Sequence, residues 1–377
     1  MRRGLFILLV VALALTGALP AEAAKRRAPQ GFYGAMWNRA GTAAPAAQHD
    51  AEFALMARSG VETVRTLFDW SAAQPAPGVT SFTETDRIVA LAAAHRIDLL
   101  PVVIYSPAWA AEYQDNRGSP PLAPSDYAAY LTKLVGRYGP RGTFWAEHPE
   151  LPKVPIRHWQ VWNEPHLVKY WYVEGGSIWS NGYTQLLRAA HGAIKRADPG
   201  ATVVTGGLAS FPWKYLNAIY RAGGRGAFDA VGINFFTSNP KNVIRGVRLT
   251  SKVLRSHHQK RKKVWLTEVT WPAAKGQAPG LLRADWQLRW QTVPAGMAAR
   301  LSELYKRAVR VRRRDGLGRV YWYTWATKYS GDDIFDYDGL LRWDGGAFQP
   351  QPALKAYVKS ARSYQGCRKT SAGRCAR

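Results

Sequence analysis

The chain has 377 residues, 47% of them hydrophobic, which predicts a globular protein with one large barrel or two ordinary domains. Lysine and arginine number 52 against 26 aspartate plus glutamate, so the protein is strongly basic. Its only cysteines are Cys367 and Cys375, with no histidine cluster beside them. That is a poor pattern for a metal site, and we expect neither a metal nor a cofactor.

The first 23 residues have the pattern of a secretory signal peptide. Arg2 and Arg3 precede an apolar run over residues 5–19, and residues 21–23 place alanine at both positions that a signal peptidase reads. A transmembrane anchor is the alternative, but the run is short for a bilayer and is followed by Pro20. We therefore expect cleavage near residue 23 and a secreted, extracellular or envelope-associated protein with no membrane span in the mature chain.

Eight apolar, strand-like runs follow, and amphipathic helical patterns separate them. The runs cover residues 32–38, 61–70, 97–105, 156–164, 201–208, 228–236, 263–270 and 320–327. The clearest helical patterns cover residues 51–59, 85–95, 125–138, 183–197 and 244–255. Such alternation is typical of an α/β protein with a parallel sheet covered on its outside, and eight units predict a (β/α)8 TIM barrel.

An open doubly wound sheet is the alternative fold. It is disfavoured because the first strand-to-helix turn lacks the Gly-x-Gly-x-x-Gly pattern. No second domain is evident, so we assign residues 24–365 to one catalytic domain and residues 366–377 to a basic tail. Residues 139–155 are too irregular for a helix, and residues 332–344 predict a loop rich in acids and aromatics near the mouth of the barrel.

The positive charge is concentrated in blocks. Residues 241–263 hold nine lysines and arginines and no acid, and residues 306–314 hold six in nine positions. Such blocks attract polyanions, although a solvated helix face is the simpler interpretation. We expect no nucleic-acid partner, because none of the basic-aromatic or zinc patterns of nucleic-acid binding accompanies the charge.

Two glutamates occupy matching positions at the ends of apolar runs. Glu164 closes the fourth run and Glu268 nearly closes the seventh. A carboxylate at the end of a buried strand is costly unless it faces a cleft, and one such residue alone would indicate a surface salt bridge. Two of them can be aimed at one bond, as in hydrolases that cleave glycosidic bonds.

Other polar and aromatic residues gather at the same strand ends, where the groove of a barrel lies. Aromatic faces can stack on sugar rings, and amides and guanidinium groups can bind hydroxyls. The predicted groove residues are Trp37, Arg65, Trp109, Asn163, His166, Asn234, Trp271 and Trp325. Asn163 and Glu164 are adjacent, so both can face a ligand only if the strand ends or bulges there.

The motifs resemble those of glycoside hydrolase clan A, the retaining (β/α)8 hydrolases, over nearly the whole mature chain. Trp-Asn-Glu-Pro at residues 162–165 resembles the end of the clan's fourth strand, and Glu268 that of its seventh. Arg65 resembles the clan's second-strand arginine. Residues 106–109 resemble its third-strand loop, and residues 338–342 resemble a segment of family 39-like members.

The resemblance implies roles for individual residues. Glu164 would be the acid/base and Glu268 the nucleophile of a retaining glycosidase. Asn163 would hold the sugar's 2-hydroxyl, and Trp325 would form the platform beneath the cleaved residue. One position departs from the clan: Phe236 stands where a tyrosine usually contacts the nucleophile, so Arg65 or Tyr323 would have to orient Glu268 instead.

Two other functions stay open. A non-catalytic carbohydrate- or cell-wall-binding barrel would use the groove for adhesion alone, and a polyanion-binding protein would use only the basic surface. The paired carboxylates favour hydrolysis of a polysaccharide or glycoside. The basic surface favours an anionic polymer as that substrate, although the sequence names neither the sugar nor the linkage.

A disulfide between Cys367 and Cys375 is expected if the chain is exported. Its loop is short, so it should add less stability than the roughly 3 kcal/mol typical of a 15-residue loop. Mass spectrometry of the alkylated native protein should find no free thiol before reduction and two after it. Two thiols in the native protein would contradict the pairing.

Overall fold

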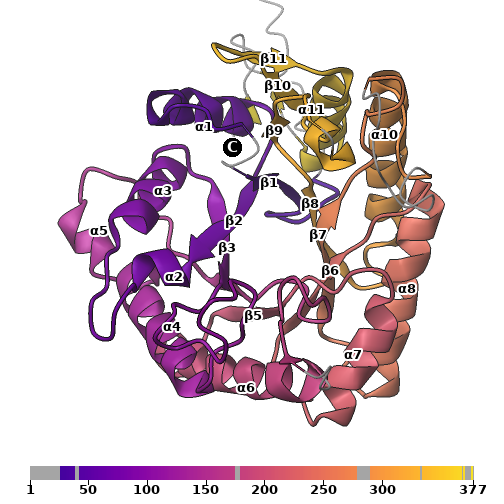
Figure 1. The fold of residues 1–377 in the computed structure, drawn as a ribbon. Helices are drawn as coiled ribbons and strands as arrows, with labels where there is room; N and C mark the ends of the chain where they lie inside the picture. Colours follow the sequence, from indigo (N-terminus) through magenta and orange to yellow (C-terminus); the bar gives the residue numbers. More distant parts are fainter. Residues whose placement is uncertain are drawn as a thin grey trace, which may run out of the picture.

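The computed structural model describes residues 26–38, 42–174, 179–277, 289–331 and 333–366, with the backbone of residues 368–369 and 375–376. The predicted signal peptide and the predicted disulfide both lie outside the described side chains. Eight parallel strands close into a barrel in the order β1-β2-β3-β4-β5-β6-β7-β8, and helices surround it (Figure 1). The predicted (β/α)8 architecture is confirmed.

Each strand lies within or overlaps its predicted run. The strands are β1 Tyr33–Trp37, β2 Thr63–Asp69, β3 Asp98–Ile104, β4 His158–Val161, β5 Thr202–Thr205, β6 Ala230–Asn234, β7 Lys263–Val269 and β8 Leu317–Trp322. Strand β8 begins and ends earlier than predicted. The apolar residues that follow it form β9, Ala326–Thr327, which belongs to a separate small sheet.

The helices form the outer ring of the barrel. They are α1 His49–Arg58, α2 Trp70–Ala73, α3 Thr83–Ala94, α4 Pro124–Tyr138, α5 Phe144–Glu147, α6 Trp179–Ala197, α7 Pro212–Arg221, α8 Pro240–Ser256, α10 Pro294–Val311 and α11 Pro352–Gln365. Five of them begin with proline, whose missing N–H is unpaired in a first helical turn anyway. None of the helices among the described residues is long and apolar enough to cross a membrane.

Two segments predicted as loops contain regular structure. The short helix α5 lies within residues 139–155, where burial of Phe144 and Trp145 supplies stability that local sequence does not. Residues 332–344 include the 3-10 helix Ile334–Tyr337 and strand β10, Leu341–Trp343. Asp333 caps that helix, and β10 lies between β9 and β11, Phe348–Pro350, in the small sheet.

The barrel interior changes in character along its axis. Toward the amino ends of the strands it is filled by one apolar cluster of Leu100, Val204, Ala230, Trp265 and Tyr321. Toward the carboxyl ends the buried side chains are polar, with Arg65, Gln160, Asn234 and Glu268 among them. An apolar base therefore supports a polar mouth, as expected for a barrel whose functional groove is at the carboxyl ends.

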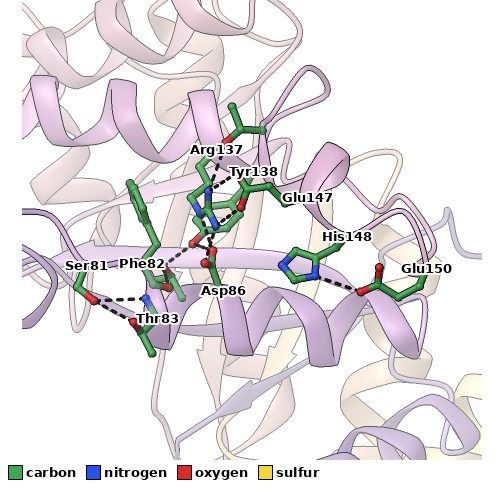
Figure 2. Close-up of polar contacts among 11 residues, drawn as sticks. Ser81, Phe82, Thr83, Asp86, Arg137, Tyr138, Glu147, His148 and Glu150 are labelled. Atoms are coloured by element: carbon green, nitrogen blue, oxygen red, sulfur yellow. Dashed lines mark hydrogen bonds and ion pairs between the residues drawn. The ribbon is translucent and has the colours of Figure 1, made fainter.

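Outside the barrel, Arg137 of α4 joins two neighbouring helices (Figure 2). It donates two 2.6 Å hydrogen bonds to Asp86 of α3 and a 2.9 Å bond to Glu147 of α5. The Tyr138 hydroxyl donates to Asp86 at 2.6 Å. The bidentate, largely buried pair is the kind of ion pair that contributes measurably to stability.

Replacing Arg137 by methionine should therefore lower the free energy of unfolding by about 2 kcal/mol, because Asp86 would be left half-buried without its cation. The control is Arg307→Met, which breaks an exposed pair with Glu303 in one helix. It should cost about 0.5 kcal/mol or less. Urea unfolding measures the free energy of unfolding of both variants. Equal losses would show that the contacts of Arg137 with Asp86 and Glu147 add no more stability than a surface ion pair.

Candidate active site

A cavity of about 410 Å³ opens at the carboxyl ends of the strands. Glu164 and Glu268 both line it, together with Asn38, Tyr170, Phe236 and Tyr323. A second cavity of about 540 Å³ continues from it and shares Glu164 but not Glu268. Its walls are mainly apolar and include Phe211, Trp290 and Phe335. The two predicted carboxylates thus meet in one space, with an aromatic extension on the side of Glu164.

The backbone after β4 explains how Asn163 and Glu164 both turn inward. The strand ends at Val161, and Trp162 and Glu164 take left-handed conformations with φ of 66° and 44°. Side chains without branching at Cβ tolerate this region at a cost, which is common at functional sites. The strand alternation is broken there, as the sequence required, and both polar side chains reach the mouth.

Glu268 lies beside irregular pairing on both edges of its strand. The β6–β7 register shifts between Ile233 and Asn234, which places Asn234 opposite Glu268. The β7–β8 register shifts between Leu266 and Val269. Such shifts re-aim side chains at the rim of a barrel. They bring Glu268 and Asn234 to the same level of the mouth.

Arg65 is the centre of a buried hydrogen-bond network. Its guanidinium donates to Glu268 at 2.7 Å, to Asn163 at 2.8 Å and to Gln160 at 2.8 Å. The Asn234 amide donates to Glu164 at 2.9 Å and to Asn163 at 3.3 Å. The two carboxylates are thereby joined through Arg65, Asn163 and Asn234.

The network gives the two carboxylates different proton affinities. Burial, and after it the negative charge of Glu268, raise the pKa of Glu164 to about 8. Burial also raises the pKa of Glu268, but the Arg65 guanidinium opposes that rise directly. Since the cation contacts Glu268 and only an amide contacts Glu164, Glu268 ionises first and Glu164 keeps the proton.

Phe236 lines the cavity in place of the tyrosine that the clan uses, as the sequence indicated. Arg65 makes the direct contact with Glu268 instead. Tyr323 also lines the cavity, and burial followed by the charge of Glu268 raises its pKa well above the usual value. Its hydroxyl therefore stays protonated and able to donate.

None of the predicted tryptophans is among the residues that line the two cavities. The Trp37 indole donates to Glu52 of α1, the Trp109 indole to the Gln74 carbonyl, and the Trp271 indole to the Thr237 carbonyl. Trp325 is fully buried. These rings pack around the barrel wall and loops, and Tyr323, two residues before Trp325, lines the cavity.

His166 is also absent from the linings of both cavities. Its ring stacks on Tyr215 with the centroids 4.2 Å apart. Burial lowers the pKa of His166 to about 4, so the ring is neutral. The structure thus shows His166 packed against Tyr215, and the prediction that it contacts substrate stays a prediction.

Several cavity residues were not among the predicted site residues. Tyr170, Lys169, Asp333 and Asp336 line the first cavity. The acidic character of residues 332–344 was visible in the sequence, but Tyr170 follows an irregular loop and has no distinguishing pattern. Among the described residues no group of histidine, cysteine, aspartate and glutamate is arranged to hold a metal ion.

Comparison with known proteins gives matches only at the level of structure. No family model and no curated protein matches the sequence. A family 39 glycoside hydrolase from Bacteroides cellulosilyticus WH2 aligns with a TM-score of 0.65 and 19% identity, over 90% of this chain and 64% of that one. The protein therefore spans less than two thirds of that neighbour.

Two further neighbours extend the comparison. A monomeric beta-xylosidase from Caulobacter crescentus CB15 aligns with a TM-score of 0.60 and 15% identity, over 90% of this chain and 69% of that one. An Ignisphaera aggregans GH53 catalytic domain aligns with a TM-score of 0.59 and 16% identity, over 93% of this chain and 99% of that one. The chain has the fold of these glycoside hydrolases. The resemblance seen in the motifs is thus confirmed for the fold.

The unequal proton affinities predict how stability depends on pH. A carboxyl whose folded pKa is about 8 and whose unfolded pKa is about 4.3 stabilises the folded state below pH 4 and loses that contribution as pH rises to 8. Glu164→Gln removes this loss. Relative to wild type, the free energy of unfolding of the variant should therefore rise by on the order of 3–5 kcal/mol between pH 4.5 and 8, with no further rise above pH 8.

Glu268→Gln is the matched control, because it leaves Arg65 buried without its anion. It should be less stable than wild type by about 3 kcal/mol over the same pH range. Chemical unfolding at half-unit pH intervals measures both variants. A pH-independent difference for Glu164→Gln would show that Glu164 is not the carboxyl that keeps the proton.

Proposed function

We propose that the protein is an exported retaining glycosidase that cleaves O-glycosidic bonds of a polysaccharide or glycoside. The observation that carries this proposal is the pair of Glu164 and Glu268 in one cavity, with a cation on the second only. A protonated acid beside an ionised nucleophile is what the first step of double displacement requires. The glycoside hydrolase neighbours share the fold that presents such a pair.

In the first step a Glu268 oxygen would attack the anomeric carbon while the bond from that carbon to the leaving oxygen breaks. Glu164 would give its proton to the leaving oxygen, so the leaving group departs neutral. Arg65 keeps Glu268 ionised and fixes one of its oxygens, which leaves the other free to attack. The result is a covalent glycosyl-enzyme on Glu268.

In the second step Glu164, now ionised, would take a proton from water as the water attacks the same carbon. The bond to Glu268 breaks, and the sugar leaves with its original configuration. Neither step needs an oxidant or a cofactor. Asn163 is held by Arg65 and Asn234 with its oxygen accepting, so its amide hydrogens are available to a hydroxyl of the bound sugar.

The cavity indicates which part of a substrate reacts. Asp333 and Asp336 line it beside the two glutamates, and Lys169 is the one cation among its described lining residues. An acid-lined space favours an uncharged sugar at the reacting position. The beta-xylosidase among the neighbours is named for such a sugar. The expected anionic character of the substrate therefore applies to parts of the polymer outside this cavity.

The second cavity fits the leaving group. It contains the acid Glu164 without Glu268, and Phe211, Trp290, Phe335 and Phe236 line it. Because the acid stands on the leaving-group side of the scissile bond, this aromatic space would hold the departing sugar or aglycone. Export rests on the signal-like residues 1–23 and stays a proposal about location.

The competing function is a carbohydrate-binding barrel without catalysis, which the absent tyrosine hydroxyl at Phe236 keeps open. Binding alone needs no unequal pair of carboxylates and no buried arginine on one of them. Hydrolysis of an aryl glycoside or a polysaccharide by wild type, together with its loss in Glu268→Gln, separates the two functions. Retained affinity without turnover in wild type would support adhesion.

Removing each of the two carboxylates should affect hydrolysis in a different way. Glu268→Ala should abolish turnover on every substrate, and added azide should restore a product of inverted configuration from the vacated space. Glu164→Ala should lose about 10²- to 10⁴-fold on a natural glycan and far less on an aryl glycoside whose leaving group needs no protonation. In wild type, kcat/KM should fall as pH rises through about 8, where Glu164 loses its proton.

Proton NMR of the first product measures the stereochemistry. We expect retention of the anomeric configuration. An inverted first product, or unaltered activity in Glu268→Ala, would overturn the assignment of Glu268 as nucleophile.

A further inference from the structure

The positive charge of the protein belongs to one half of the barrel. Residues 26–174, which form β1 to β4 with α1 to α5, hold 14 lysines and arginines and 14 acids, a net charge of zero. Residues 175–366, which form the remaining strands and helices, hold 31 lysines and arginines and 11 acids, a net charge of +20. The excess is therefore a property of one side of the molecule (Figure 1).

Helix α8 carries the most regular part of this charge. Its exposed side chains include Lys241, Arg245, Arg248, Lys252 and Arg255, and its buried ones are apolar or small. The spacing of four, three, four and three residues aligns the five cations in one row, about 5 Å apart along the helix and about 21 Å long. Helix α10 packs beside α8 and contributes exposed Lys306 and Arg310. We call these seven residues the cationic wall.

The wall is not an ordinary solvated surface. An ordinary surface mixes both signs, whereas successive residues of the α8 row are like charges three or four apart, which repel. The row has no acid in the first turn of its helix, where an anion would be favourable. Among the described residues only Arg248 of the row has an ion-pair partner, Asp315 at 3.5 Å. The arrangement costs the helix stability and leaves the cations free for an external anion.

The row also leads to the active site. Phe236 lines both cavities, and α8 begins four residues later at the mouth of the barrel, capped by Asn239. Lys241 therefore stands at the rim, and the row runs from there down the outside of the barrel to Arg255. A chain bound along the row would have one end beside the cavity.

We propose that the cationic wall binds a linear anionic polysaccharide and holds it while an uncharged unit of the polymer reaches the acid-lined cavity. The choice of a polysaccharide rests on the proposed function. A row with one charge for each helical turn suits a linear polymer with repeated anionic groups. The charges inside the cavity exclude that polymer's anionic units from the reacting position, so binding and cleavage use separate surfaces.

Other polyanions fit the wall less well. Helix α8 has no aromatic residue, and Tyr305, the aromatic residue of α10, is buried, so nucleic-acid bases have nothing to stack on. The helix is flanked by α7 and α10 and does not project into a groove. None of the large exposed apolar side chains of the described chain lies on α8, which disfavours insertion into a lipid surface.

The test compares two triple variants of equal charge change. Arg245→Gln, Lys252→Gln and Arg255→Gln remove three wall cations and keep the Arg248–Asp315 pair. The control removes exposed Arg58, Lys133 and Lys153 from the neutral half, also by glutamine. None of these six side chains has an ion-pair partner among the described residues, and none lines a cavity described above. Thermal unfolding checks that both variants fold.

Polygalacturonate is the probe, with binding measured by fluorescence anisotropy from low to physiological salt. The wall variant should bind about tenfold more weakly at low salt, and its plot of log Kd against log salt should be less steep by about two units. The control variant should bind like wild type. Glu268→Ala should also bind like wild type, so a failure of the proposed hydrolysis leaves this result unaffected.

Three outcomes would overturn the proposal. The wall variant could keep wild-type affinity, or the control could weaken equally, which would mean that only net charge matters. Alternatively, double-stranded DNA or phosphatidylserine vesicles could bind more tightly than polygalacturonate and depend on the same three residues. That result would assign the wall to a nucleic acid or a membrane instead.

Discussion

Arg65 brings a positive charge into the interior of the barrel, where its side chain is 2% exposed. An isolated buried guanidinium would be very costly, so the surrounding residues must satisfy it with hydrogen bonds and an anion. Glu268, Asn163 and Gln160 do so from strand β7, the end of β4 and β4 itself. Strands β2, which carries Arg65, β4 and β7 are distant in sequence and are therefore held at one level of the barrel by one side chain.

The properties of the site follow from that single charge. It keeps one carboxylate ionised, and that charge adds to the rise that burial gives the pKa of Glu164. It turns the Asn163 oxygen inward, which leaves the amide hydrogens for a ligand. Because Arg65 contacts Glu268 directly, that carboxylate is held in place although Phe236 has no hydroxyl to donate to it.

The fold and the two carboxylates could be predicted from sequence because both depend on local patterns. Eight apolar runs predict eight strands, and two carboxylates that end such runs in matching positions favour a shared cleft. The tryptophans could not be placed in this way. Whether a residue past a strand end faces the cavity or the helices depends on the last residue that keeps the strand alternation, and a shift of one residue reverses it. Trp325 and Tyr323 illustrate this, since β8 ends at Trp322 and only Tyr323 lines the cavity.

The two charged regions of the molecule differ in their exposure to solvent, because the wall is exposed and the pair of carboxylates is buried. Charges more than about 8–10 Å apart across solvent are largely screened at physiological salt, so the exposed wall has little influence on the buried pair of carboxylates. The pKa values of the pair are shifted first by burial and then by the neighbouring charges, including Arg65, which contacts Glu268 at 2.7 Å. Added salt can therefore screen the wall without changing which carboxylate carries the proton. A barrel with one neutral and one basic half thus keeps the exposed charges apart from the buried charged network, and each can vary by surface or interior substitutions without disturbing the other.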